Sequence, residues 1–355
     1  MSDSIYLDYA AATPMDNSVR EAMEPYFTQK YYNPSAGYLA AKEVHQDLEK
    51  ARANVAHWLG AKPSEIVFVA GGTEANNLAI HGLMSRLPDA NVVASAIEHE
   101  SVLEPAGKYD SRIATVGDDG RIDLEKLKAT IDNQTVLVSI MYANNEIGTV
   151  QPIKDIARLI SEERDNRRKA GNKTPIYLHT DACQAGNYLD LHVSRLGVDL
   201  MTINGGKIYG PKQSAVLYVK AGVDLQPIIT GGGQERNLRS GTENIAAAVG
   251  FARALDLVQT DRHDEAARLQ KIQAESLALI AQKLPSALVN GSTRFRLPNN
   301  IHLTLPGQDN ERLLIQLDEA GIMAAAGSAC SASDEDPSHV LRAIGLSDED
   351  AQASI

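Results

Sequence analysis

Short apolar runs alternate with longer stretches of helical periodicity along the first two thirds of the chain. The apolar runs predict strands over 66–70, 92–96, 135–142, 176–180, 198–203 and 215–219. Between several of them, a 3.6-residue pattern predicts helices over 73–84, 123–131 and 152–170. Strands that alternate with helices in this way indicate an α/β fold with a mostly parallel sheet that is covered on both faces.

The pattern changes after about Gly241. A long helical region over 243–284 carries an apolar stripe that includes Phe251 and Leu255, and it is followed by a strand over 300–305 and a helix over 311–320. A single core rarely grows beyond ~250–300 residues, so a chain of 355 residues with 43% hydrophobic content predicts two domains. We expect a large α/β domain over 16–260 and a smaller α+β domain made of 1–15 and 261–355.

Net charge, hydropathy and cysteine content limit the partners and the cell compartment that the sequence suits. The formal net charge is -12, which disfavours nucleic acid or an anionic membrane as the main partner. No apolar run approaches the ~18 residues of a membrane-spanning helix, and the first residues do not resemble a signal peptide. The two cysteines form no disulfide framework, and the nine histidines show no metal-ligand spacing. These features predict a cytoplasmic protein without a metal site.

Lys207 stands in a Gly-rich turn, 204–212, between two apolar runs. A lysine in a buried turn is less hydrated, and its neutral amine can form a Schiff base with an aldehyde. An ordinary surface lysine in a hairpin is the alternative from this segment alone.

A phosphate site is predicted at Gly72 and Thr73, which follow one strand and open a helix. Glycine lets the backbone approach a ligand closely, and the free N–H groups of a helix start attract an anion. A plain strand–helix turn would have the same sequence, so this motif is weak by itself.

Four further polar side chains follow other strands. Asp181 could pair with a protonated ring nitrogen, while Gln184 and Asn145 could bind a phenolic oxygen of the same ring. His99 could stack on that ring and move protons. Individually these residues also suit a helix cap, a turn or a surface position. Ligands of open α/β sheets bind beyond the carboxyl ends of the strands, and together these groups are the ones that pyridoxal phosphate requires.

With these residues in place, the chain resembles the cysteine desulfurases of the iron–sulfur-cluster type, fold-type I enzymes of the class-V aminotransferase family. The matching segments occur in the family's order at 6–14, 72–77, 98–99, 144–148, 181–184, 207–212, 239–242 and 327–331. The resemblance implies a pyridoxal-phosphate-dependent transferase with a mostly parallel, seven-stranded large domain and a smaller α+β domain. It also implies conversion of L-cysteine to L-alanine, a homodimer, and a sulfur-acceptor or iron–sulfur scaffold protein as partner.

The resemblance assigns a role to each site residue. Lys207 would form the Schiff base with the cofactor and move protons at the substrate α-carbon. Cys330 would be the nucleophile that receives sulfur as a persulfide, and Thr242 would reach the phosphate bound by the other subunit. The cofactor-binding residues implied are Gly72, Thr73, His99, Asn145, Asp181, Gln184, Asn204, Lys207 and Thr242. Cys183 is interpreted as a packing residue.

The sequence departs from the family pattern at two places. Asn204 and Gly206 stand where a serine and a histidine are usual, which predicts weaker cofactor binding unless a main-chain N–H compensates. The family continues after residue 355 with an arginine that binds the substrate carboxylate, so we expect the small domain to be incomplete at its C-terminal end. Arg342 or Arg236 is then the candidate for that role.

Two other functions are open at this point. A lyase or aminotransferase acting on a different amino acid would use the same fold, although the segment around Cys330 argues against it. A non-catalytic protein that binds a sulfur-transfer partner is suggested by Gly206 and by the missing arginine.

Overall fold

A seven-stranded sheet forms the centre of the molecule in the computed structural model, which describes residues 4–327 and 337–355. Its strands, in spatial order, are β2 (Ile66–Val69), β8 (Ala215–Val219), β7 (Leu200–Asn204), β6 (Tyr177–Asp181), β5 (Thr135–Ser139), β3 (Asn91–Ser95) and β4 (Asp110–Ala114). β8 runs antiparallel to β2 and β7, and the remaining pairs are parallel. The mostly parallel sheet predicted from the sequence is confirmed.

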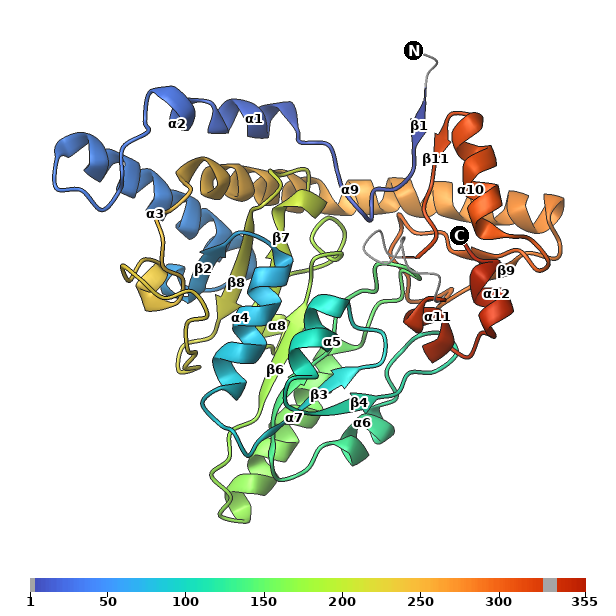
Figure 1. The fold of residues 1–355 in the computed structure, drawn as a ribbon, viewed down its shortest axis with the longest axis horizontal. Helices are drawn as coiled ribbons and strands as arrows, with labels where there is room; N and C mark the ends of the chain where they lie inside the picture. Colours follow the sequence, from blue (N-terminus) through green and yellow to red (C-terminus); the bar gives the residue numbers. More distant parts are fainter. Residues whose placement is uncertain (1–3, 328–336) are drawn as a thin grey trace.

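Helices cover both faces of this sheet, as expected from its continuous apolar strands (Figure 1). In β8, Ala215 and Leu217 face a core built with α4 (Gly72–Met84) and α5 (Glu100–Ala106). Val216 and Tyr218 face the opposite core. That second core includes α3 (Leu39–Leu59), α6 (Leu124–Thr130), α7 (Ile153–Lys169), α8 (Val193–Leu196) and the first half of α9 (Ile245–Lys283). Alternation of side chains along the strands therefore supplies two cores from one sheet.

The long helix α9 crosses from the sheet to the C-terminal elements, which are drawn in orange and red in Figure 1. Its buried residues end at Gln259. Beyond it lie two small sheets, β1 (Ile5–Tyr6) with β11 (Ile322–Met323) and β9 (Leu288–Val289) with β10 (Leu303–Thr304). The helices here are α10 (Asn310–Glu319), α11 (His339–Ala343) and α12 (Asp348–Gln352), while α1 (Asn17–Met23) and α2 (Pro25–Thr28) lie near the start of α9. The domain boundary at residue 260 stays a prediction.

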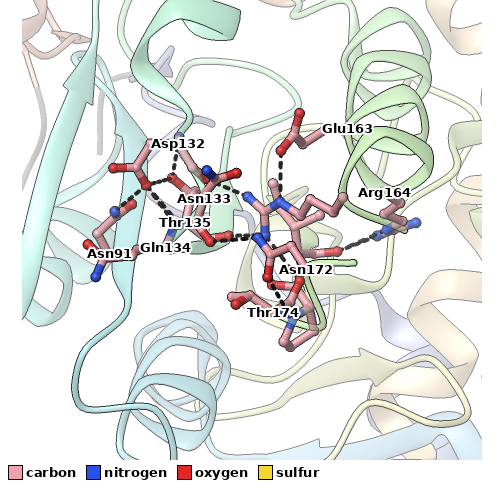
Figure 2. A network of polar contacts seen from close by, with 12 residues as sticks. Asn91, Asp132, Asn133, Gln134, Thr135, Glu163, Arg164, Asn172 and Thr174 are labelled. Atoms are coloured by element: carbon pink, nitrogen blue, oxygen red, sulfur yellow. Dashed lines mark hydrogen bonds and ion pairs between the residues drawn. The ribbon is translucent and has the colours of Figure 1, made fainter. Parts of the chain in front are cut away.

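A network of polar contacts holds the amino ends of two neighbouring strands (Figure 2). The buried Arg167 guanidinium, at the end of α7, donates to the carbonyl oxygens of Asp132 and Thr135 at 2.6 and 2.8 Å and pairs with Glu163. The Asp132 carboxylate accepts from Asn91 Nδ2 at 2.8 Å. These bonds hold the amino ends of β3 and β5. The predicted site residues follow the carboxyl ends of the strands, at the opposite edge of the sheet.

Candidate active site

The carboxyl ends of five strands meet at one edge of the sheet, and the loops that follow them carry the predicted residues. β2 leads to the start of α4, β3 to the start of α5, β5 to the loop 140–148, β6 to the turn 182–186 and β7 to the turn 205–210. The residues brought to this edge are Gly72, Thr73, His99, Asn145, Asp181, Gln184, Asn204 and Lys207. One edge of one sheet thus collects groups that are up to 135 positions apart (207 minus 72) in the sequence.

Lys207 lies in a turn between β7 and β8, so the hairpin alternative describes its backbone correctly. Its side chain is half-buried, and Nζ donates to the carbonyl oxygens of Ala10 and Ala11 at 2.7 and 2.5 Å. Thr13 Oγ1 accepts from the Tyr209 N–H at 2.8 Å and donates to the Gly206 carbonyl oxygen at 3.2 Å. The N-terminal segment therefore lies along the turn and holds the lysine at the edge of the sheet.

Glycine is required at one position of this turn and is dispensable at another. A Cβ on Gly205 would fall 2.1 Å from Ser214 Oγ, so no larger residue fits there. At Gly206 the nearest atom to a Cβ would be Asn204 Oδ1 at 3.5 Å, an ordinary contact. The Gly206 N–H already donates to Asn204 Oδ1 at 3.0 Å. That main-chain group is therefore engaged by Asn204 and does not take the place of a missing side chain.

The start of α4 has the features of an anion site. Gly71 caps the helix without a side-chain hydrogen bond, so the first N–H groups have no intrahelical acceptor, and Thr73 is exposed. A Cβ on Gly72 would lie 3.0 Å from Cys183 Sγ and 3.5 Å from Asn204 Nδ2, so glycine keeps this helix end close to β6 and β7. Burial raises the pKa of the Cys183 thiol well above its usual range, and the Asp181 carboxylate raises it further. Cys183 is accordingly a neutral packing group.

Asp181 is held in place from two sides. One carboxylate oxygen accepts from the Cys183 N–H at 2.9 Å, and the other accepts from Asn76 Nδ2 at 2.7 Å. Only 8% of the residue is exposed. Beneath it on the same face of β6, burial lowers the pKa of His179 to about 4, so that imidazole is neutral. Asp181 therefore presents a fixed carboxylate at the edge of the sheet.

His99 caps α5, because its Nδ1 accepts from the Ser101 N–H at 3.0 Å. Its neighbour Glu98 is fully buried, and one of its oxygens accepts from the Met141 N–H at 2.7 Å. Burial raises the pKa of Glu98 well above its usual range. Because Glu98 is buried beneath the cap, His99 is the polar group that this strand end presents.

The loop after β5 is organised by Asn144, which directs Asn145 outward. Asn144 Oδ1 accepts from the N–H groups of Glu146 and Ile147 at 2.9 Å each, and its Nδ2 donates to the Ile97 carbonyl oxygen. Asn145 lines a cavity of about 730 Å³, and Gln184 lines the same cavity. Gln184 donates to the Ala10 carbonyl oxygen, which also accepts from the lysine amine. The cavity therefore opens beside Lys207.

The two arginines considered for the substrate carboxylate lie elsewhere. Arg236 donates to the Ile66 carbonyl oxygen beside the buried Arg52, and Arg342 pairs with Asp348 at 2.7 Å. Neither lines the cavity. Among the described residues that line the cavity, the one arginine is Arg268. Its guanidinium pairs with Glu265 through two hydrogen bonds of 2.7 Å.

Two predicted residues are not brought to this edge within the described chain. Thr242 is exposed on a separate hollow of about 240 Å³, next to Arg239 and Ala70. Arg239 pairs with Glu74 at 2.9 Å, which ties the loop of Thr242 to the first turn of α4. Cys330 lies outside the described residues, so its predicted role has no structural account here.

Sequence reasoning missed Asn76, Ser101 and Asn144, which contact or orient the predicted groups. A signal existed for Asn76, since it is a polar residue one turn into a helix whose neighbours Ala75 and Leu78 are apolar. No comparable pattern distinguishes Ser101.

In the part of the chain that the structure describes, no cluster of side chains could hold a metal ion, and no helix has the length and apolar character needed to span a membrane.

Comparison with known proteins agrees with this geometry. The sequence matches the family described as Aminotransferase class-V over residues 5–351. The chain belongs to the class-V aminotransferase family. A curated relative, cysteine desulfurase IscS of Dictyoglomus turgidum, is 38% identical over 100% of this chain and 89% of its own length.

Solved structures of class-V relatives have the same fold. A NifS-like protein superposes with a TM-score of 0.90 and 30% identity, covering 99% of this chain and 92% of its own. SspA in complex with cysteine superposes with a TM-score of 0.85 and 34% identity, covering 99% of this chain and 97% of its own. The fold-type I architecture expected for this class-V chain is confirmed.

Proposed function

We propose that the protein is a pyridoxal-phosphate-dependent cysteine desulfurase, which converts L-cysteine to L-alanine and passes the sulfur to an acceptor for iron–sulfur cluster or thio-cofactor assembly. The observation that carries the proposal is the convergence of Lys207, Asp181 and the α4 start at one sheet edge, beside a cavity. The relative named cysteine desulfurase IscS, covered over 89% of its length, and the likeness to SspA in complex with cysteine support the same function.

The residues at the edge fit the cofactor. The uncapped start of α4 with Thr73 suits a phosphate, and the absence of a side chain at Gly72 lets this helix end pack close to Cys183 and Asn204. Asp181, with both oxygens already oriented, suits a protonated ring nitrogen, and Asn145 and Gln184 suit the ring oxygen. His99 would lie on the ring face.

When bound, the cofactor would supply an electron sink for the substrate α-carbon. Asp181 would keep the proton on the ring nitrogen, which makes that sink effective. Lys207, whose Nζ donates to the carbonyl oxygens of Ala10 and Ala11, would hold the cofactor through its aldehyde group and would carry a proton to and from the substrate α-carbon.

Cys330 would take the sulfur. Its thiolate would form an S–S bond with the substrate sulfur as the C–S bond breaks, and the substrate carbon would gain a proton to give L-alanine. The persulfide on Cys330 would then pass sulfur to the acceptor protein. Replacement of Cys330 by alanine is expected to leave cofactor binding intact and to abolish sulfide release with a thiol reductant. Turnover like that of the unaltered protein would remove Cys330 from this role.

A homodimer in the cytoplasm is the proposed state. Four large apolar side chains are exposed on α2, in the loop after it and at the start of α3, namely Phe27, Tyr31, Tyr38 and Leu39. They lie beside the start of α9, because Val44 and Leu48 of α3 pack on Ile245 and Ala248. Since Thr242 directly precedes α9, a second copy that covers this face would receive Thr242 at its phosphate site.

Two alternatives make different predictions. A lyase or aminotransferase on another amino acid would bind the cofactor and ignore L-cysteine. A non-catalytic sulfur-transfer partner would bind no cofactor, even after incubation with it.

The test is the visible absorbance spectrum of the purified protein before and after L-cysteine is added. A yellow protein whose band changes with L-cysteine, with L-alanine formed, is the expected result. Lys207→Ala serves as the control and should lose the band of the covalently bound cofactor. A band that ignores L-cysteine would contradict the substrate, and a protein that stays colourless with added cofactor would contradict the proposal as a whole.

A further inference from the structure

A continuous chain of hydrogen bonds connects Asp181 to His99 through two residues that have no assigned role. Asn76 Nδ2 donates to Asp181 at 2.7 Å and to Ser101 Oγ at 2.9 Å. Ser101 Oγ in turn lies 2.9 Å from His99 Nδ1. Asn76 is fully buried and Ser101 is 8% exposed, so water does not compete for these bonds.

The direction of each bond follows from the chemistry of the groups. An ionised carboxylate only accepts, so the amide of Asn76 must turn its NH₂ group toward Asp181. Both amide hydrogens are then used, and Asn76 Oδ1 has no partner among the described residues. A buried carbonyl oxygen without a partner is unfavourable, so the two donated bonds determine the orientation of the amide.

The same logic sets the proton position on His99. Ser101 Oγ accepts from Asn76, so its own hydrogen points to His99 Nδ1. The Ser101 N–H also donates to that nitrogen at 3.0 Å. Nδ1 is thus an acceptor of two bonds, which places the proton of the neutral ring on Nε2.

We propose that Ser101 and Asn76 are positioning residues that hold the ring-nitrogen carboxylate and the stacking imidazole in one fixed relation. The inference rests on the proposed function, because Asp181 and His99 act there on the cofactor. Asn76 stands one turn after Gly72 on α4, so a single helix supplies the anion site and orients the groups for the ring nitrogen and the ring face. In this relay of hydrogen bonds from Asp181 to His99, the serine hydroxyl and the Asn76 amide can each be removed without touching the backbone cap of α5.

The experiment replaces Ser101 by alanine and uses a matched control from the same chain. His192 precedes α8 as His99 precedes α5, and Ser194 Oγ lies 3.0 Å from His192 Nδ1 at the same helix position. Ser194→Ala removes the same kind of bond at an exposed site away from the sheet edge. Ser101→Thr keeps the hydroxyl and tests for rescue.

Two measurements are made. The ¹⁵N resonance of His99 Nδ1 is recorded in the cofactor-free protein, and the dissociation constant of pyridoxal phosphate is measured by titration. We expect Ser101→Ala to move the Nδ1 resonance and to weaken cofactor binding about 3- to 10-fold, the effect of one neutral hydrogen bond. Ser101→Thr should restore both values, and Ser194→Ala should change neither. Asn76→Ala, which removes both donated bonds, should weaken binding more than Ser101→Ala.

An Nδ1 resonance that does not move in Ser101→Ala would overturn the relay, whatever the protein binds. A moved resonance with unchanged cofactor affinity would overturn the positioning role. Failure of the unaltered protein to bind pyridoxal phosphate would instead count against the proposed function, and the resonance alone would then decide whether the relay exists.

Discussion

Gly206 is a position at which we predict that one residue affects cofactor affinity without a role in the chemistry. It stands beside Lys207 at the sheet edge, its N–H is engaged by Asn204, and there is room for a Cβ. The position therefore contributes neither a side chain nor a free main-chain donor to a phosphate. A single substitution at Gly206 is therefore expected to supply a hydrogen-bond donor for the phosphate.

Replacement of Gly206 by histidine is expected to tighten pyridoxal phosphate binding about tenfold, the effect of one added hydrogen bond to a charged group. The measurement is a titration of cofactor-free protein. Ala170→His is the control, because Ala170 is exposed at the end of α7, away from this edge of the sheet. Equal or weaker binding in Gly206→His would mean that the side chain does not reach the phosphate.

Residues that follow strands could be assigned from the sequence because parallel strands bring their carboxyl ends together. Asp181, His99 and Asn145 were predicted in this way, and the structure places them at one edge. The sequence marks Asn76 as a polar residue among apolar neighbours, but the partners of Asn76 and Ser101 could not be predicted, since they are set by how α4 and α5 pack on the sheet. Contacts between helices depend on packing angles that no local pattern records.

At the scale of elements, the central strands were predicted within a few residues, and the differences have physical causes. The strand predicted over 135–142 ends at Ser139, because the following residues bend into the loop that Asn144 organises. The strand predicted over 300–305 is reduced to Leu303–Thr304. The antiparallel direction of β8 follows from the short turn at Lys207, which is too short for a crossover.

The amino ends of these strands carry a pH-dependent contribution to stability. Burial alone would raise the pKa of Asp132, but hydrogen bonds from Asn91 and Gln134 and the Arg112 guanidinium lower it to about 2. The unfolded value is about 3.9, so the folded state favours the ionised form. This contribution is complete above pH ~4 and is lost as the pH falls toward ~2.

Asp132→Asn should therefore lower the free energy of unfolding at neutral pH and flatten its decline between pH ~4 and ~2. Urea unfolding at a series of pH values measures both effects. Asp165→Asn makes the same change of charge on the exposed face of α7. If both variants follow the unaltered protein across this range, the network is not the source of the acid sensitivity.

At the scale of the whole molecule, the proposed dimer depends on an exposed apolar face. Tyr38 and Leu39 are 54% and 78% exposed at the start of α3, on the side where α9 begins. A pair of glutamates there would place charge against apolar surface in an interface. Without the interface, Thr242 would no longer lie at the phosphate site of the other copy.

Tyr38→Glu with Leu39→Glu is expected to shift the protein from dimer to monomer in sedimentation velocity experiments and to weaken cofactor binding. Leu279→Glu is the control, since Leu279 is 55% exposed on the second half of α9. An unaltered protein that sediments as a monomer would contradict the dimer itself.

The attachment of the N-terminal segment to the Lys207 turn has a consequence for synthesis on the ribosome. Thr13 and Gly206 are 193 positions apart, and Lys207 and Ala10 are 197 apart. At ~5–20 residues per second, the first segment waits about 10 to 40 s before its docking site leaves the ribosome. The parallel strands β3, β4, β5 and β6 end by Asp181 and can pair during that interval, while Lys207 acquires its contacts with the N-terminal segment only afterwards. A nascent chain stalled before residue 200 should therefore pair these strands and be unable to bind the cofactor.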